Sequence, residues 1–423
     1  MQFVTPRGFR DVLFESARER ELVAAAMSEV FSAWGYDPVE TPVAEEYRTL
    51  ETGVGSMLDR TAFRLIDLDG ALLALRPEMT VPIARVVASR LSDTPGPHRV
   101  RYAADVFREH ASLRGQARQF TQVGVELVGT GGPAADSEVV MVLVGALEAA
   151  GLPRFTVSIG TAELFRAVLE RAGGPATWRD EAIAAAQSRN LVELDRVASR
   201  EGLGPETAAA LREVPRLRGG ADALERAMAH ATACGVPECL CDLRQTWRTL
   251  ESLEMTGRVS LDFGIMRSFG YYTGMQLEAY APGLGLPLAG GGRYDRLLAA
   301  FGAPAPAAGF ALGLERVMIA LAEQGVSPRT EPLDAVLGGL EPAAVLAEAA
   351  GLRSAGWRVR VAPGRTGVTL LREADAAGAA EALVVADGAL WRVDRAGQQA
   401  TRLGEPVPAP PRLTWAARGG EVR

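Results

Sequence analysis

The sequence has no lysine, only three cysteines and only three histidines among its 423 residues. The 45 residues counted as lysine or arginine are therefore all arginine. This excludes mechanisms that need a lysine, such as a Schiff base or a P-loop. The cysteines are Cys234, Cys239 and Cys241, and the histidines are His98, His110 and His230. Their spacing fits no zinc pattern, and an odd cysteine number argues against a disulfide framework. We therefore expect no metal site, no cofactor and no Ser-His-Asp mechanism.

Long apolar runs are also missing, and acidic residues outnumber basic ones. No run reaches the length of a membrane span, and residues 1–7 lack the apolar core of a signal peptide. The net charge of −7 argues against a protein that is held on nucleic acid by bulk charge. We expect a cytoplasmic protein with no membrane or nucleic-acid partner, although an RNA enzyme with one basic patch stays open.

Hydrophobic periodicity predicts a mixture of helices and strands. Amphipathic spacing predicts a helix over 18–34, and alternation predicts a hairpin over 60–76 and a strand pair at 98–109 and 118–128. The other predicted elements are an extended run at 37–43, strands at 259–263, 271–280, 290–292, 335–337, 357–361 and 382–385, helices at 135–151, 293–301, 342–355 and 368–377, and a strand followed by a helix over 309–323.

These elements divide the chain into a large core and a small domain. The core covers residues 1–326 and contains a mostly helical insertion over 160–255, rich in Ala, Leu and Arg. A linker follows at 327–333. Residues 334–404 alternate strands with helices, which indicates a small α/β domain. Residues 405–423 form a proline-rich tail.

Charged and polar side chains gather in six short stretches among the predicted strands. The stretches are 75–80, 107–109, 118–126, 267–274, 290–295 and 309–316. Strand alternation places Gln122, Gly124 and Glu126 on one face. Two polar side chains beside a glycine leave room for a small polar ligand. Ordinary salt bridges are the alternative, and they predict charges on both faces of the sheet.

The side chains of these stretches suit a zwitterion with a basic side chain. Glu78 adds a second carboxylate, and Arg267 offers a fork for a ligand carboxylate. Tyr271 or Tyr272 offers a hydroxyl. Carboxylates would bind the ammonium and ring nitrogens, and the arginine would bind the carboxylate.

The order of the stretches resembles the class II histidyl-tRNA synthetase fold across nearly the whole chain. Pro42 matches the dimer motif, Phe107-Arg108 the second class II motif and Gly313 to Arg316 the third, and residues 290–295 resemble the glycine-rich histidine motif. The resemblance implies an α+β fold. It would be a class II aminoacyl-tRNA synthetase-like antiparallel sheet with flanking helices and a helical insertion, followed by a small α/β, anticodon-binding-like domain.

The resemblance also implies a histidine pocket. Its residues would be Glu78, Thr80, Gln122, Glu126, Arg267, Tyr271, Tyr272 and Tyr294. The first two would hold the α-amino group of histidine. Glu126 and Tyr272 would hold the imidazole. Arg267 and Gln122 would hold the carboxylate.

Two functions are common in this superfamily at this chain length. One is a histidine–tRNA ligase, and the other is a catalytically silent relative, the regulatory subunit of ATP phosphoribosyltransferase. A ligase must bend ATP and stabilise its phosphate charge with arginines. Arg108, Arg267 and Arg316 could stabilise this charge, which favours the ligase, and Arg108 and Arg316 are the candidates for nucleotide or phosphate contacts.

Three positions depart from the ligase pattern. The ligase reads Phe-Arg-x-Glu, whereas this chain has His110 in the fourth place and Glu109 one place early, which turns the carboxylate to the other strand face. Gln116 replaces an arginine that meets the γ-phosphate, and losing it removes a charge-assisted bond of about 1.5–3 kcal/mol. Gly270 replaces an aspartate. Residues from Asp334 onward show no basic cluster of the kind a tRNA reader needs.

These departures favour the regulatory subunit over the ligase. The chain has no phosphoribosyltransferase phosphate loop, so a separate short-form catalytic subunit would perform the transfer. The resemblance then implies a non-catalytic protein of histidine biosynthesis that binds L-histidine as effector and exerts allosteric regulation. It would dimerise through its first helix and the Pro42 region within a hetero-octamer. A stand-alone histidine sensor or adaptor is a further alternative.

Overall fold

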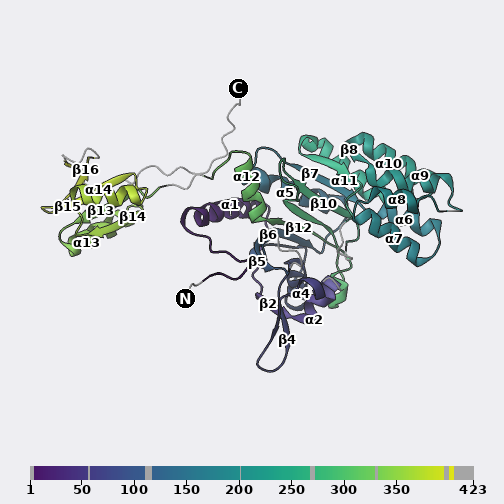
Figure 1. The fold of residues 1–423 in the computed structure, drawn as a ribbon, viewed down its shortest axis with the longest axis horizontal. Helices are drawn as coiled ribbons and strands as arrows, with labels where there is room; N and C mark the ends of the chain where they lie inside the picture. The colour runs from purple at the N-terminus through teal and green to yellow at the C-terminus, as the bar shows by residue number, and fades with distance from the viewer. Residues whose placement is uncertain are drawn as a thin grey trace. The chain divides into compact units, whose positions relative to one another are not determined.

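The computed structural model describes residues 4–55, 58–109, 117–200, 202–266, 272–328, 332–394 and 400–403. The chain divides into two compact units, Met1–Pro328 and Arg329–Arg423. Each unit has its own sheet and its own hydrophobic core, and Figure 1 shows both.

The first unit is built on a large sheet with nine strands within the described residues. In order across the sheet these are β1 (Asp37–Pro38), β5 (His98–Phe107), β6 (Gln119–Val128), β12 (Ala307–Gly313), β11 (Ala289–Arg293), β10 (Met275–Tyr280), β7 (Thr156–Thr161), β9 (Val259–Asp262) and β8 (Arg218–Gly219). Only β1 with β5 and β7 with β9 run parallel. The predicted strand pair at 98–109 and 118–128 is confirmed. The predicted strand over 271–280 is shorter, because β10 begins at Met275.

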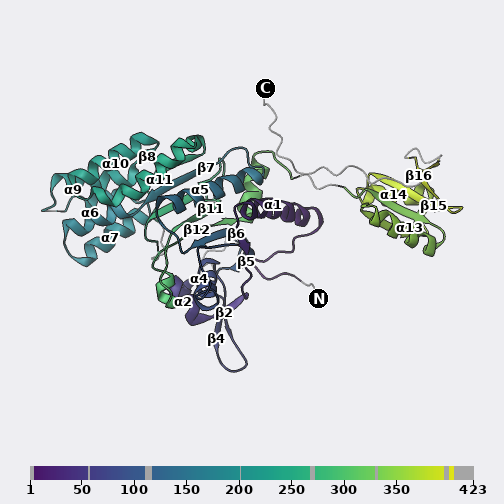
Figure 2. The same cartoon turned by 180° about the vertical axis from the view of Figure 1, so that it is seen from behind.

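One face of this sheet is covered by long helices. They are α1 (Phe14–Ala33), α5 (Gly132–Ala149) and α12 (Leu314–Glu323). The helix predicted over 18–34 is confirmed as α1, which buries Val23, Met27 and Phe31 against α5 and the sheet. Figure 2 shows α1 and α5 from behind, next to β6 and β12. No helix in the described part of the chain combines the length and apolar character needed to cross a bilayer.

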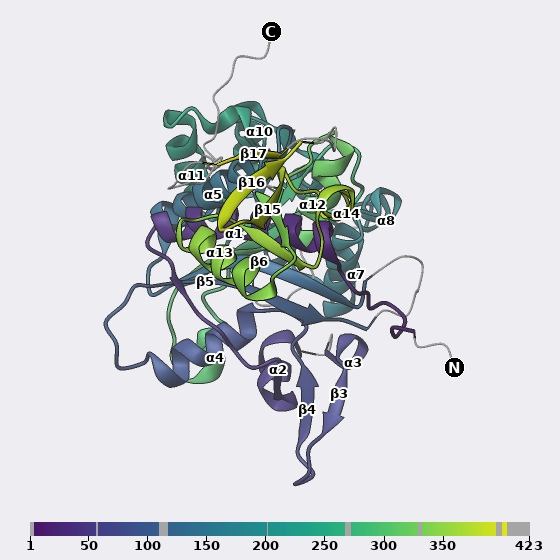
Figure 3. The same cartoon turned by 90° about the vertical axis from the view of Figure 1, so that its left-hand side faces the viewer.

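A second, smaller layer lies on the other face. It comprises a three-stranded sheet and three helices within the described ranges. These are β2 (Ala44–Glu46), β3 (Arg64–Ile66), β4 (Leu72–Leu75), α2 (Tyr47–Val54), α3 (Leu58–Thr61) and α4 (Thr80–Arg90). The hairpin predicted over 60–76 is confirmed as β3 and β4, and Figure 3 shows it extending away from α2 and α4.

The helix predicted over 293–301 is wrong. Arg293 ends β11, a turn follows, and only η5 (Leu298–Phe301) is helical, as a 3-10 turn. Tertiary hydrogen bonds hold the turn: the Asp295 carboxylate accepts the Ala307 N–H at 2.9 Å, and the Asp295 N–H donates to Thr273 Oγ1 at 3.0 Å. These bonds fix the segment to its neighbouring strands, and they override its helical periodicity.

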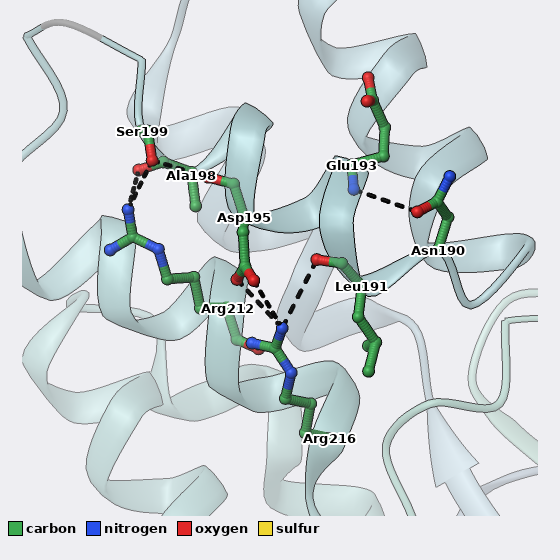
Figure 4. Close-up of polar contacts among 8 residues, drawn as sticks. All are labelled: Asn190, Leu191, Glu193, Asp195, Ala198, Ser199, Arg212 and Arg216. Carbon is green, nitrogen blue, oxygen red and sulfur yellow. Dashed lines mark hydrogen bonds and ion pairs between the residues drawn. The ribbon is translucent and has the colours of Figure 1, made fainter.

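A helical lobe fills the chain between β7 and β9. Its helices are α6 (Glu163–Ala172), α7 (Ala176–Gln187), α8 (Leu191–Val197), α9 (Pro205–Glu213), α10 (Ala221–Ala233) and α11 (Cys241–Ser252). The lobe is joined to the large sheet because η2 (Val214–Arg216) leads into β8, which pairs with β9 at the sheet edge. Polar contacts such as Arg216 with Asp195 tie the lobe helices together (Figure 4).

The second unit is a five-stranded sheet, among its described residues, with a helix on each face. Its elements are β13 (Ala335–Gly339), α13 (Pro342–Ser354), β14 (Val359–Pro363), α14 (Gly367–Ala376), β15 (Glu381–Ala386), β16 (Ala389–Val393) and β17 (Ala400–Arg402). Ala335 and Leu337 pack with α13, whereas Val336 packs with α14. The predicted alternation of strands and helices is confirmed.

Candidate functional site

Strand β6 separates a core face from a polar face. Val123, Val125 and Leu127 belong to the hydrophobic core that contains α1 and α5. Because side chains alternate along a strand, Gln122 and Glu126 point to the opposite face, toward α4. The predicted sharing of one strand face by these two polar side chains is confirmed.

Glu126 is almost completely buried, with 1% exposure. The Tyr294 hydroxyl donates a short hydrogen bond to its Oε2, and the Tyr102 hydroxyl lies 3.2 Å from its Oε1. Gly309 lies directly opposite on β12, and any Cβ there would overlap the Glu126 carboxylate. Glycine at this position therefore makes room for the carboxylate inside the sheet.

Burial raises the pKa of Glu126 from 4.5 to about 8. The hydrogen bonds from Tyr294, Thr80 and Tyr102 act in the opposite direction, since they stabilise the ionised form, and the nearby charge of Glu78 adds to the increase. A cation brought to this carboxylate would offset the cost of burying its charge. The site is thus suited to a ligand with a protonated ring or amine.

Glu78 lies at the start of α4 and is also buried. Its two oxygens accept the N–H groups of Thr80 and Val81, both at 2.8 Å, which satisfies donors in the first turn of the helix. Gln122 Oε1 accepts the N–H of Met79 at 3.0 Å. Burial raises the pKa of Glu78, while these hydrogen bonds and Arg108 lower it. The α4 N-terminus is therefore fixed to β6 beside Glu126.

A cavity of about 80 Å³ opens beside these groups. Six of the residues proposed from the sequence line it: Glu78, Thr80, Arg108, Gln122, Tyr272 and Arg316. The remaining lining residues are Phe120, Pro287, Leu288, Ala289, Gly290, Ala311 and Gly313, which come from β6, β11, β12 and the chain before β11. Residues that are up to 238 positions apart in sequence thus meet around one small polar cavity, since Glu78 and Arg316 both line it.

The two arginines of the cavity are held by backbone carbonyls. Arg108 Nε donates to the Pro77 oxygen at 2.7 Å, and its guanidinium lies over the Phe120 ring at 5.1 Å. Arg316 Nη1 donates to the Pro287 oxygen at 2.6 Å. Both cations therefore have defined positions at the cavity wall, where either can face an anionic group of a ligand.

Two of the proposed residues, Arg267 and Tyr271, lie outside the described residues. Glu126 and Tyr294 are hydrogen-bonded to each other, and neither lines the cavity. The space predicted over Gly124 is filled, because the Phe310 carbonyl oxygen of β12 and the Tyr102 hydroxyl lie where a Cβ would project. Tyr102 was missed from the sequence, because the strand pattern does not give the register that places it opposite Gly124 of β6.

A buried ion pair that the sequence did not reveal supports Tyr294. Arg293 Nη2 lies 2.6 Å from Asp136 Oδ1 on α5 and donates to the Gly132 oxygen at 3.0 Å. The Arg293 side chain passes close to Gly274, where a Cβ would crowd it. The residue before Tyr294 is therefore anchored to α5, which fixes the direction of the tyrosine toward Glu126.

Comparison with known proteins places the chain. The family model of histidyl-tRNA synthetase matches residues 8–317. An ATP phosphoribosyltransferase regulatory subunit of Moorella thermoacetica is 38% identical over 84% of this chain and 90% of that protein, and one of Symbiobacterium thermophilum is 39% identical over 89% and 96%. The chain belongs to the histidyl-tRNA synthetase family, among its ATP phosphoribosyltransferase regulatory subunits.

A solved structure supports the fold. A protein of Bacillus halodurans described as an ATP phosphoribosyltransferase regulatory subunit/histidyl-tRNA synthetase is 32% identical, has a TM-score of 0.80, and covers 91% of this chain and 98% of its own. The predicted class II synthetase-like fold with an additional small domain is thereby confirmed.

A charged pair lies next to the ends of β5 and β6. Glu109 does not line the cavity and forms an ion pair with Arg118. The Arg118 guanidinium lies over the rings of Phe63, at 4.5 Å, and Phe9, at 5.7 Å. His110, Gln116 and Gly270, on which the sequence comparison with the ligase also depended, lie outside the described residues. In the described residues, no group of three or more His, Cys, Asp or Glu side chains is placed to hold a metal ion.

Proposed function

We propose that this protein is a regulatory subunit of ATP phosphoribosyltransferase in histidine biosynthesis and that it binds L-histidine beside Glu126. The observation that carries the proposal is the pairing of two buried carboxylates, Glu78 and Glu126, with an arginine-bearing cavity on the polar face of β6. Histidine has two cationic groups and one carboxylate, which match this arrangement. The names of its curated relatives support the regulatory role.

The chemistry of binding follows from the groups in the site. The imidazole of histidine would take the proton of Glu126 and become a cation next to the carboxylate, which compensates the buried charge. Glu78 and Thr80 would receive the α-amino group. Arg267 and Gln122 would receive the carboxylate. Tyr272 would close the site beside the imidazole.

Regulation would follow from a difference in histidine affinity between two arrangements of the complex. A coupling of about 1–3 kcal/mol between histidine and the partner is typical of allosteric systems. Transfer of the phosphoribosyl group would take place on a separate short-form catalytic subunit, and this chain would itself be non-catalytic. We further propose a cytoplasmic hetero-octamer in which this chain dimerises through α1 and the Pro42 region.

Reconstitution with a purified short-form catalytic subunit tests the proposal. Transferase activity should appear, or rise strongly, only when the two chains are mixed, and it should fall when histidine is added. If mixing changes nothing, the chain is not the regulatory subunit. A stand-alone sensor would bind histidine without any effect on the catalytic subunit.

A histidine–tRNA ligase is the second candidate, because Arg108 and Arg316 both line the cavity. The engagement of Arg118 with Glu109 and two aromatic rings argues against it, since this arginine, which lies close to the second class II motif in the structure, is held by groups of the protein itself. Histidine-dependent exchange between ATP and pyrophosphate by the purified chain separates the two candidates. We expect no exchange, and exchange at a ligase-like rate would replace the regulatory proposal by the ligase.

A further inference from the structure

A second, larger cavity lies in the helical lobe. Its lining residues are different from those proposed to bind histidine. Its volume is about 280 Å³. It is lined by Ala186, Arg189, Leu191, Leu194, Pro215, Arg216 and Arg218. The three arginines come from the α7–α8 turn, from η2 and from β8, so the fold brings them together from different elements.

Arg216 is a structural member of this group. Its Nη2 lies 3.0 and 3.1 Å from the two oxygens of Asp195, and its Nη1 donates to the Arg212 oxygen at 2.6 Å. Figure 4 shows this guanidinium between Asp195 and the Leu191 oxygen. The Asp195 carboxylate compensates the charge of Arg216, and two backbone oxygens fix the position of its guanidinium.

Arg189 and Arg218 share a carboxylate partner. Both approach the same atom, Oδ2 of the buried Asp262: Arg218 Nε at 3.1 Å and Arg189 Nη2 at 3.6 Å. The other oxygen of Asp262 accepts the Gly264 N–H at 2.7 Å. Arg189 also lies 3.8 Å from the Glu278 carboxylate, and it contacts the Tyr280 hydroxyl, which donates to that carboxylate.

Two partly exposed guanidiniums thus share one carboxylate oxygen. Their side chains are 43% and 55% exposed, for Arg189 and Arg218 respectively. Arginine presents its N–H groups as a planar fork that suits phosphate oxygens. A carboxylate has two oxygens and matches a single fork, whereas a terminal phosphate has three and can meet two guanidiniums that arrive from different directions.

The rest of the lining is apolar. Ala186, Leu194 and Pro215 are buried, and Leu191 is exposed. Small-molecule sites combine such an apolar surface with a few placed polar groups, in cavities of about 300–1,000 Å³. The observed volume of about 280 Å³ is just below this range, which suits a monophosphate with one flat body better than a dinucleotide.

We propose that this lobe cavity binds a phosphomonoester with a flat apolar body, of the nucleoside monophosphate class. The phosphate lies between Arg189 and Arg218, and the base lies against Leu191, Leu194 and Pro215. This site is independent of the histidine site, because it uses none of its residues.

Calorimetric titration of the purified full-length chain tests the proposal, with AMP as the probe. We expect AMP to bind at one site, ribose 5-phosphate and inorganic phosphate to bind more weakly, and adenosine not to bind. Arg189→Gln and Arg218→Gln should each weaken AMP binding by about tenfold or more, since each removes a charged hydrogen-bond partner. Arg189→Lys, which keeps the charge but not the fork, should fall between wild type and Arg189→Gln.

Arg196→Gln is the matched control. Arg196 lies on α8 and is paired with Glu181 and Glu193 on the exposed surface, and it does not line the cavity. The control should bind AMP as wild type does. The proposal is overturned if AMP does not bind the wild-type chain, or if Arg189→Gln, on its exposed turn, leaves affinity unchanged. It is also overturned if Arg108→Gln alone abolishes binding, because the nucleotide then occupies the synthetase-like cavity.

Discussion

Arg293 and Asp136 form an ion pair with 2.6 Å between Nη2 and Oδ1, and their side chains are only 7% and 1% exposed. The pair joins β11 to α5. The residue that follows Arg293 is Tyr294, whose hydroxyl donates to Glu126. The buried pair therefore acts as a support for the proposed histidine site, although neither of its members lines the cavity.

Asp136→Asn should destabilise the protein and weaken histidine binding. Removing one member of a buried ion pair costs up to about 3–5 kcal/mol, and here it leaves Arg293 with only the longer contact to the more exposed Asp295, at 3.3 Å. Denaturant unfolding and histidine titration measure the two effects. Glu148→Gln on the same helix is the control: its partner Arg258 is 3.2 Å away at an exposed position, so the change should cost less than about 1 kcal/mol. Equal stability of the two variants would contradict the supporting role of the pair.

Gly309→Ala should abolish histidine binding. The added Cβ would overlap the Glu126 carboxylate and the Val125 oxygen, so the carboxylate must leave its position between Tyr102 and Tyr294. Gly257→Ala is a suitable comparison, since nothing lies within 4 Å of its Cβ position. Calorimetry with histidine should show binding for the comparison variant and none for Gly309→Ala. Normal affinity in Gly309→Ala would show that the Glu126 carboxylate is not the contact.

Glu126→Gln should change how stability depends on pH. Burial raises the pKa of Glu126 from 4.5 to about 8, so between these pH values the folded chain holds a proton that the unfolded chain has lost. This group therefore makes the wild type less stable as pH rises from about 4.5 to about 8. Glutamine does not ionise, so the variant should lack that part of the decline. Urea unfolding at pH 4.5 and at pH 8 measures the free energy of unfolding of both proteins. As the pH rises, the variant should become more stable relative to wild type, and an unchanged difference between them would contradict the pKa assignment of Glu126.

Histidine affinity should be highest between the pKa of the free imidazole, about 6.5, and that of Glu126, about 8. The bound state has a protonated imidazole beside an ionised Glu126. Below this window both groups are protonated before binding, so binding must release the proton of the carboxyl group. Above it the imidazole is neutral and the carboxylate is ionised, so binding must take up a proton. In Glu126→Gln, histidine affinity should lack the part of its decline above pH 8 that ionisation of Glu126 causes. The histidine amino group titrates in the same way with both proteins, so its effect cancels when the two pH profiles are compared. Identical pH profiles would show that Glu126 does not pair with the imidazole.

Strand alternation was enough to predict the polar face of β6. The period of two placed Gln122 and Glu126 together, and the pairing of 98–109 with 118–128 brought the neighbouring strand beside them. The register of that pair did not follow from the pattern, so Tyr102, opposite Gly124, was missed. Register depends on contacts across strands and with the rest of the core.

The features that could not be predicted from the sequence depend on hydrogen bonds and ion pairs between residues far apart in the chain. The stretch after Arg293 has helical spacing but is fixed by Asp295 to Ala307 and Thr273. Asp136 gave no signal, because its partner is 157 residues away. The arginine-lined cavity of the lobe was missed for the same reason: Arg189 and Arg218 meet at Asp262 only after β8 has joined the sheet.

The most direct test of the central claim is histidine inhibition of the reconstituted transferase containing either the wild-type chain or Glu126→Ala. Inhibition is expressed relative to the activity of each complex without histidine, and Glu148→Gln serves as the control chain. The half-inhibitory histidine concentration should rise by about tenfold or more with Glu126→Ala, since the imidazole loses a charge-assisted partner, and it should stay at the wild-type value with Glu148→Gln. Equal inhibition of all three complexes would contradict the account, because the effector site would then lie outside this cavity.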